Sequence, residues 1–154
     1  MKNLLFALGI LSCSMTGCVG TQGASNSKQQ TTEALNAPLK LNGSWELADI
    51  PGARVSVVGL YPEKKPVITF DVNDNKFVGN TSCNNFSGLL VVFGNKISFN
   101  KSMAMTKMMC PGEGESTFIE SLKKVDTYTI NADKSLSLNI GGVETLRMKK
   151  VIKE

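Results

Sequence analysis

Sulfur-containing side chains gather in one short segment of the sequence. Met103, Met105, Met108, Met109 and Cys110 all fall within eight positions. Thioether and thiolate sulfurs are soft ligands that suit Cu(I), so a copper-handling site is one interpretation of the cluster. We favour structural packing, because methionine fills irregular gaps in cores and the alternate spacing of Met103 and Met105 fits one face of a strand. We therefore predict no metal site and no cofactor.

The chain contains no histidine. This excludes Ser-His-Asp and Cys-His catalysis and every metal site that needs an imidazole ligand. Carboxylates are present, but their spacing marks out no catalytic pair: Glu46, Asp49, Asp71, Asp74, Glu113, Glu115 and Glu120. There is no Gly-rich phosphate loop. We predict that the protein is not an enzyme and has no catalytic residues; a carboxylate-based hydrolase would need two neighbouring acidic residues in a pocket.

The first residues have the three parts of a secretory signal: a basic tip, a short uncharged apolar run over residues 4–11, and a zone of small residues. The apolar run is too short to span a bilayer, which takes about 20 apolar residues. Residues 15–18, Met-Thr-Gly-Cys, resemble the bacterial lipobox, in which the cysteine becomes lipidated. Cys13 fits less well, because the bulky Leu11 stands where a small residue is expected. We predict a lipoprotein signal peptide over residues 1–17 and lipidation of Cys18; the alternative is an ordinary cleaved signal with an incidental cysteine.

Residues 18–39 contain almost no large apolar side chains and are predicted to form a flexible tether. Residues 40–154 have the length of one domain. The lipid would make a membrane the first partner of the protein and place it in the cell envelope. Because Val19-Gly20 lacks the Asp that retains enteric lipoproteins at the inner membrane, we expect the outer membrane, facing the periplasm.

Two cysteines, Cys83 and Cys110, remain outside the signal region. An even pair in an exported and oxidising compartment predicts a disulfide. Two buried free thiols are the alternative that this reasoning leaves open.

Short strand-like runs alternate with turn signals through most of the predicted domain. The runs cover residues 44–47, 55–60, 67–71, 76–79, 89–93, 96–99, 127–130, 135–140 and 143–148. Gly94-Asn95 and Gly141-Gly142 are typical of two-residue hairpin loops. Residues 115–125 differ, since Phe118, Ile119 and Leu122 recur at helical spacing. We predict an α+β fold: a small antiparallel, partly closed sheet or barrel with one packed helix.

Two segments of this domain carry a family resemblance. Residues 82–88, Ser-Cys-Asn-Asn-Phe-Ser-Gly, and residues 103–111, Met-Ala-Met-Thr-Lys-Met-Met-Cys-Pro, resemble the paired motifs of the META domain. Their likeness is greatest to the HslJ-like group, which are heat-inducible envelope proteins of enteric bacteria. The resemblance implies a META-type α+β fold and supports a Cys83–Cys110 bond. It also implies a loose association with stress tolerance and novobiocin resistance, but brings no catalytic residues with it.

The motif residues that we single out are Asn84, Asn85, Phe86, Met105, Thr106, Met108 and Met109. Asn84-Asn85 is open to two interpretations: a surface recognition loop with Phe86 as an exposed anchor, or a turn beside the disulfide with Phe86 in the core. We favour the turn, because Asn readily adopts turn conformations and bonds its own backbone.

The net charge of +4 is modest and dispersed, with basic residues at Lys64-Lys65 and over residues 147–153. We interpret these as a solvated face and expect no nucleic-acid binding. The prediction is a monomeric, non-enzymatic envelope lipoprotein that acts in stress tolerance or antibiotic resistance by binding a small molecule or an envelope protein. The alternative is a pilot or chaperone lipoprotein for an outer-membrane or secretion component.

Overall fold

The computed structural model describes residues 38–99 and 103–152. The predicted signal peptide, Cys18 and most of the predicted tether lie outside the described residues. Strands make up most of the described chain: β1 Gly43–Asp49, β2 Val67–Asp71, β3 Lys76–Asn80, β4 Asn85–Leu89, β5 Val91–Phe93, β6 Lys96–Ser98, β7 Met103–Met105, β8 Thr127–Ile130, β9 Leu136–Ile140 and β10 Val143–Lys150. Helix α2 covers Val57–Leu60 and helix α3 covers Gly114–Lys124. None of the helices in this part of the chain is long and apolar enough to cross a membrane.

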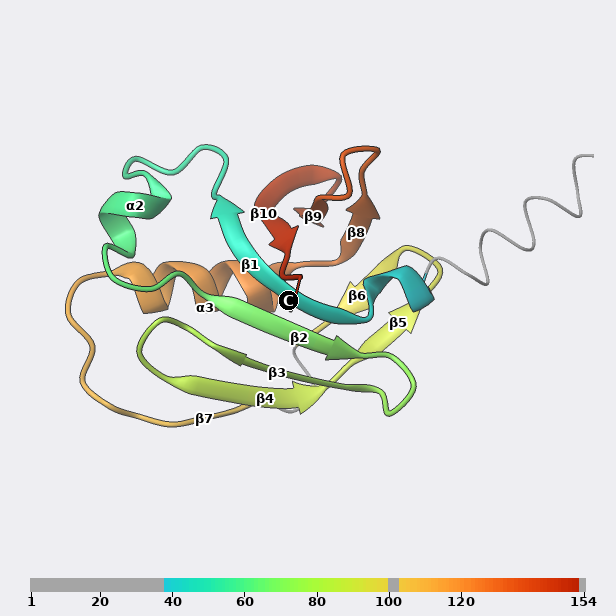
Figure 1. Ribbon diagram of the computed structural model, residues 1–154, viewed down its shortest axis with the longest axis horizontal. Helices are drawn as coiled ribbons and strands as arrows, with labels where there is room; N and C mark the ends of the chain where they lie inside the picture. The colour runs from blue at the N-terminus through green and yellow to red at the C-terminus, as the bar shows by residue number, and fades with distance from the viewer. Residues whose placement is uncertain (1–37, 100–102, 153–154) are drawn as a thin grey trace, which may run out of the picture.

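The strands form one antiparallel sheet in the order β5-β6-β8-β9-β10-β1-β2-β3-β4-β7. The sheet curls into a half-barrel with α3 running across it, and β5 and β7 are its two edges (Figure 1). This confirms the predicted α+β fold with a partly closed sheet and one packed helix. Because β4 and β7 are neighbours, the two motif segments lie side by side.

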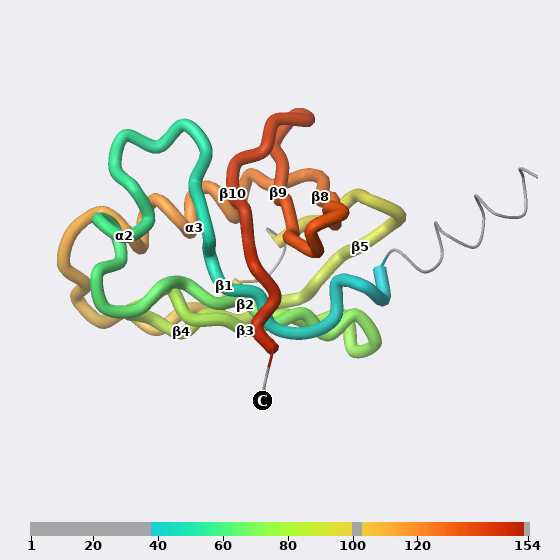
Figure 2. Tube along the Cα trace, turned by 45° about the horizontal axis from the view of Figure 1, so that its top comes forward, coloured from blue at the N-terminus to red at the C-terminus, as the bar shows by residue number. Residues whose placement is uncertain are grey.

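The core lies between the curled sheet and α3 (Figure 2). Phe118, Ile119 and Leu122 are buried on one side of the helix, as their spacing predicts. Phenylalanine rings fill much of the interior: Phe77 meets Phe99 edge to face at 5.2 Å, and Phe86 lies 6.0 Å from Phe118. Such ring pairs add stabilisation beyond the burial of apolar area. Phe86 is therefore a core residue that connects the first motif to the helix.

Both predicted glycine-containing hairpin loops are present. Gly94, Gly141 and Gly142 all have positive φ, at 59°, 57° and 82°, which is the conformation that such tight turns require. The prediction of a strand-like run over residues 55–60 is wrong, because Val57–Leu60 forms the helix α2. The Ser56 hydroxyl accepts a hydrogen bond from the Gly59 amide at 3.3 Å and caps this single turn, a local bond that overrides the β propensity of its valines.

Gly79 in β3 has no room for a side chain. A Cβ built there would lie 2.6 Å from the Val67 carbonyl oxygen and would also meet the Phe86 ring. We expect Gly79→Ala to lower the free energy of unfolding by about 1–3 kcal/mol, because overpacking displaces a strand or a core ring. Urea unfolding measures the change. Val78→Ala, on the exposed neighbour, is the control, and equal losses for the two variants would contradict the packing explanation.

Candidate functional site

A buried asparagine organises the connection between the two motifs. Asn84 closes a turn that begins at Thr81: the Thr81 amide donates to the Asn84 carbonyl oxygen at 2.8 Å, and the Asn84 amide donates to the Thr81 hydroxyl at 2.9 Å. The left-handed residue of this turn is Ser82, with φ 88°, and not an asparagine. Asn84 itself is 0% exposed. The favoured turn is therefore present, but its asparagine side chain points into the protein.

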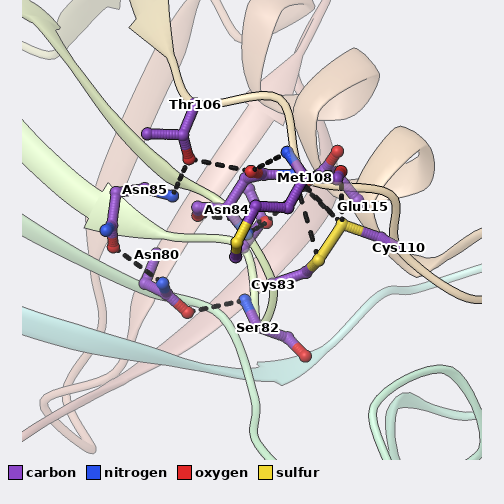
Figure 3. Close-up of a disulfide and its surroundings, with 10 residues drawn as sticks. Asn80, Ser82, Cys83, Asn84, Asn85, Thr106, Met108, Cys110 and Glu115 are labelled. Carbon is purple, nitrogen blue, oxygen red and sulfur yellow. Dashed lines mark hydrogen bonds between the residues drawn. A yellow bond between two sulfur atoms is a disulfide. The ribbon is translucent and has the colours of Figure 1, made fainter.

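The Asn84 side chain holds the second motif in place (Figure 3). Its Oδ1 accepts hydrogen bonds from the Thr106 hydroxyl and the Met108 amide, both at 2.8 Å. Its Nδ2 donates to the Met108 carbonyl oxygen at 3.0 Å. Because the Met108 backbone N–H can only donate, the atom of the Asn84 side-chain amide that faces it must be the oxygen Oδ1. One side chain thus satisfies both polar groups of the Met108 backbone.

Glu115, in the first turn of α3, completes this network. Its Oε2 accepts hydrogen bonds from Asn84 Nδ2 at 2.9 Å and from the Thr81 hydroxyl at 2.6 Å. Hydrogen bonds to a carboxylate are stronger than those between neutral groups. The network therefore connects three separate pieces of chain: the first motif, the second motif and the helix. Sequence reasoning missed this role, since it placed Glu115 near the start of the helix and among carboxylates whose spacing marks out no catalytic pair.

Cys83 and Cys110 form a disulfide beside this network, with a Cα–Cα distance of 6.0 Å. Cys110 Sγ lies 3.0 Å from Asn84 Nδ2 and 3.5 Å from Glu115 Oε2. The bonded sulfur carries no proton, so the contact with Glu115 is not a hydrogen bond. The predicted pairing is thus present, and the alternative of two free thiols is not.

The sulfur-rich cluster does not form one set of ligands. Met103 and Met105 lie in β7 and pack against the core, whereas Met108 is exposed and Met109 is 99% exposed. Cys110 has no free thiolate because of its bond to Cys83. Among the described residues, Cys83, Cys110 and Glu115 do cluster, but their two bonded sulfurs are not available to a metal. Packing accounts for Met103 and Met105, but not for the exposed Met108 and Met109.

Asn85 belongs to the exposed side of the same motif. It begins β4. Its backbone amide donates to the Thr106 hydroxyl at 3.0 Å, and its side-chain Oδ1 accepts from Asn80 Nδ2 at 2.8 Å. The structure therefore brings together most of the predicted motif residues, from Asn84 to Met108, and leaves Met109 outside the network. Asn80 is a further member that sequence reasoning missed.

A groove of about 760 Å³ lies over β2, β3, β4 and β7, on the face that presents Asn85 and Thr106. The side chains that line it are small and largely apolar, with some amides and hydroxyls among them. They include Val67, Thr69, Val78, Asn80, Asn85, Ser87, Ala104 and Thr106. Lys64 is the one charged residue in the lining, which contains no carboxylate and no cysteine. Small-molecule sites have volumes of about 300–1,000 Å³ and combine apolar walls with a few polar groups.

A smaller hollow, of about 320 Å³, lies between the end of α2 and the disulfide. The Tyr61 hydroxyl donates to the Gly114 carbonyl oxygen there at 2.6 Å. Burial of this phenol raises its pKa to about 12. Glu63, Glu113 and Glu115 all line the hollow, but Glu115 is already engaged by Thr81 and Asn84. The larger groove is therefore the candidate binding site.

A half-barrel crossed by one helix, with an Asn-centred network between two motif segments, defines a small α+β domain. The META domain matches residues 37–151, and the chain belongs to this family. An NMR structure of a protein from Burkholderia xenovorans is similar, with a TM-score of 0.61 and 18% identity over 94% of this chain and 100% of that chain.

A crystal structure of a DUF4847 family protein from Bacteroides vulgatus is also similar, with a TM-score of 0.53 and 17% identity over 78% of this chain and 99% of that one. At these identities the likeness concerns the fold alone. No curated protein matches the sequence.

Proposed function

We propose that this META domain protein is a non-enzymatic lipoprotein of the bacterial cell envelope, anchored through Cys18 to the outer membrane and facing the periplasm. It contributes to stress tolerance or to novobiocin-type resistance by binding a small amphipathic molecule. The observation that carries the binding role is the groove over β2, β3, β4 and β7. The signal-like first residues and the lipobox-like residues 15–18 support the location.

The groove offers the two things that an amphipathic ligand needs. Val67, Val78 and Ala104 provide apolar surface, while the side-chain amides of Asn80 and Asn85 provide directed hydrogen bonds. The lining contains hydroxyls and Lys64 but no carboxylate and no cysteine, so its hydroxyls have no carboxylate base to activate them, which favours binding over catalysis. The buried Asn84 network holds β4 and β7 in register, and so keeps the wall of the groove rigid without contacting a ligand.

Blocking the groove tests this proposal. Val78 lies in the lining and is 49% exposed, so Val78→Lys should leave the fold intact and introduce a charge into the site. We expect novobiocin affinity, measured by calorimetry, to fall at least about tenfold, which corresponds to roughly 1.4 kcal/mol. Val58→Lys, on α2 and outside the groove, is the matched control.

The same two variants should also differ in their ability to restore tolerance in cells. A deletion strain complemented with Val58→Lys should regain its tolerance to heat and novobiocin, and one complemented with Val78→Lys should not. If both variants complement equally, the groove is not the functional site.

The second candidate is the pilot or chaperone role, and one observation favours it. Strand β7 is an edge of the sheet, and the exposed side chains of Met108 and Met109 lie shortly after its end at Met105. Edge strands and flexible methionines are both suited to binding another polypeptide. A stoichiometric envelope partner that is captured by the parent protein and lost with the pair Met108→Lys and Met109→Lys would support this role.

A further inference from the structure

An exposed aromatic ring and three lysines share one end of the molecule. Phe93, the last residue of β5, is 84% exposed beside the Gly94-Asn95 turn. Lys96 begins β6, and Lys123 and Lys124 end α3. All four line a single hollow of about 600 Å³, together with Val91, Ile97, Ser98, Val125 and Asp126. This basic-apolar face, defined by Phe93, Lys96, Lys123 and Lys124, is distinct from the groove proposed above.

The fold holds the hairpin and the helix end together. Lys96 in β6 pairs with Thr127 in β8, and the Ile97 amide donates to the Asp126 carbonyl oxygen at 3.0 Å. Because β8 follows α3 directly, this pairing brings the end of the helix against the β5–β6 hairpin. The β6–β8 pairing therefore holds Lys96 close to Lys123 and Lys124.

The face carries a net positive charge. None of its three lysines takes part in an ion pair among the residues that the structure describes. Asp126 is the one acidic residue of the hollow, and it is engaged elsewhere: its Oδ2 accepts from the Gly141 amide at 2.9 Å, and its Oδ1 accepts from the Thr127 hydroxyl at 3.0 Å. These hydrogen bonds lower the pKa of Asp126. Three cations and one carboxylate leave the face complementary to an anionic surface.

The position of the face relative to the start of the domain suggests which surface it meets. The described chain begins, at residue 38, at the same end of the molecule as the β5–β6 hairpin, and α2 lies at the other end (Figures 1 and 2). Residues 18–37 number 20 and reach at most about 70 Å when fully extended. A lipid on Cys18 would therefore keep this end of the domain within reach of the bilayer.

We propose that the basic-apolar face is a second, peripheral membrane contact that binds anionic phospholipid head groups. Phe93 enters the boundary between head groups and acyl chains, while Lys96, Lys123 and Lys124 bind the phosphates. Exposed aromatic side chains flanked by lysines are the composition of interfacial membrane anchors. Each lysine near an anionic bilayer strengthens partitioning by about fivefold. The lipid anchor of the proposed function determines which membrane this face would meet, but the binding of anionic head groups by Phe93 and the lysines does not depend on that anchor.

The test uses tryptophan as a depth probe in the full protein purified from membranes. Phe93→Trp and, as the matched control, Val58→Trp each place an indole at an exposed position, since Val58 is 68% exposed on α2. Each variant is reconstituted in vesicles of phosphatidylcholine and phosphatidylglycerol with brominated acyl chains. The parent protein, whose single tryptophan Trp45 is buried, provides the baseline.

We expect strong quenching of Trp at position 93 and little at position 58. Most of the quenching at position 93 should be lost in pure phosphatidylcholine, or when Lys96, Lys123 and Lys124 are all replaced with Gln. Equal quenching at the two positions would overturn the proposal, as would quenching at position 93 that depends neither on lipid charge nor on the lysines. The face would then be assigned to a protein partner.

The mass of the purified protein reports the acyl chains on Cys18 separately. A chain without them would contradict the lipid anchor of the proposed function. The same quenching measured on that unanchored chain, added to the vesicles, would still decide whether the face binds anionic lipid.

Discussion

Replacing Asn84 with alanine is expected to lower the free energy of unfolding by about 3–4 kcal/mol, because buried polar groups lose their partners and cannot reach water. The variant removes four side-chain hydrogen bonds, to Thr106, to both backbone groups of Met108 and to Glu115. The disulfide, the β4–β7 pairing, the Thr81–Glu115 hydrogen bond and the Phe86–Phe118 contact would still connect the two motif segments and α3. Urea unfolding followed by circular dichroism measures the loss.

Asn85→Ala is the matched control for this prediction. The neighbouring side chain is exposed and its one side-chain hydrogen bond, to Asn80, is also exposed. We expect a loss below about 1 kcal/mol, since the partner left behind can bind water. If the two alanine variants were equally stable, the buried network would not carry the stability that we assign to it.

Asn84→Asp adds a test by pH. The new carboxylate would replace Nδ2 with an oxygen that cannot donate to the Met108 carbonyl oxygen and would lie beside Glu115. Like charges and burial raise the pKa of a carboxyl group, so the variant is least stable at neutral pH. Its deficit relative to the parent should shrink as the pH falls through that raised pKa and the group becomes protonated. A deficit that is constant from pH 7 to pH 4 would contradict the proximity of Glu115.

Loss of the disulfide is the second large effect that we expect. Cys83 and Cys110 are separated by 27 positions, and closing a loop of this length stabilises the folded protein by about 3.5 kcal/mol on the chain-entropy model. The pair Cys83→Ala and Cys110→Ala should therefore shift the urea midpoint to a much lower concentration. Reduction of the parent protein with dithiothreitol should produce a similar shift.

The double variant also serves as the control for reduction. Dithiothreitol should not change its stability, because Cys13 and Cys18 are the only cysteines left in its sequence and the disulfide is gone. A parent protein whose midpoint does not respond to reduction would contradict a stabilising role for the bond.

Sequence patterns located most of the elements of this domain. The alternating runs at residues 67–71 and 127–130 coincide with β2 and β8, and the helical spacing around Phe118 coincides with α3. These elements could be predicted because apolar periodicity records which face of a strand or helix is buried. Residues 55–60 could not, since a one-turn helix has too few residues to show a period, and its capping bond from Gly59 to Ser56 overrides β propensity.

The candidate site was only partly predictable. The types and spacing of the motif residues identified the two segments and the cysteine pair, but not the function of Asn84. Its burial depends on where β4, β7 and α3 meet, and no local pattern contains that information. Asn80 and Glu115 were missed for the same reason, because each acquires its role only through partners brought to it by the fold.

The sequence by itself determined the positions of most strands, the hairpin loops, the packed helix and the family resemblance, because these depend on neighbours along the chain. It did not predict β4, and it assigned residues 55–60 to a strand. Only the tertiary structure decided that Asn84 is a buried connector, that the groove lies over β2, β3, β4 and β7, and that Phe93 shares a face with Lys123 and Lys124. The physical reason is sheet pairing across long sequence separations, which brings residues together according to strand order and not according to their distance along the chain.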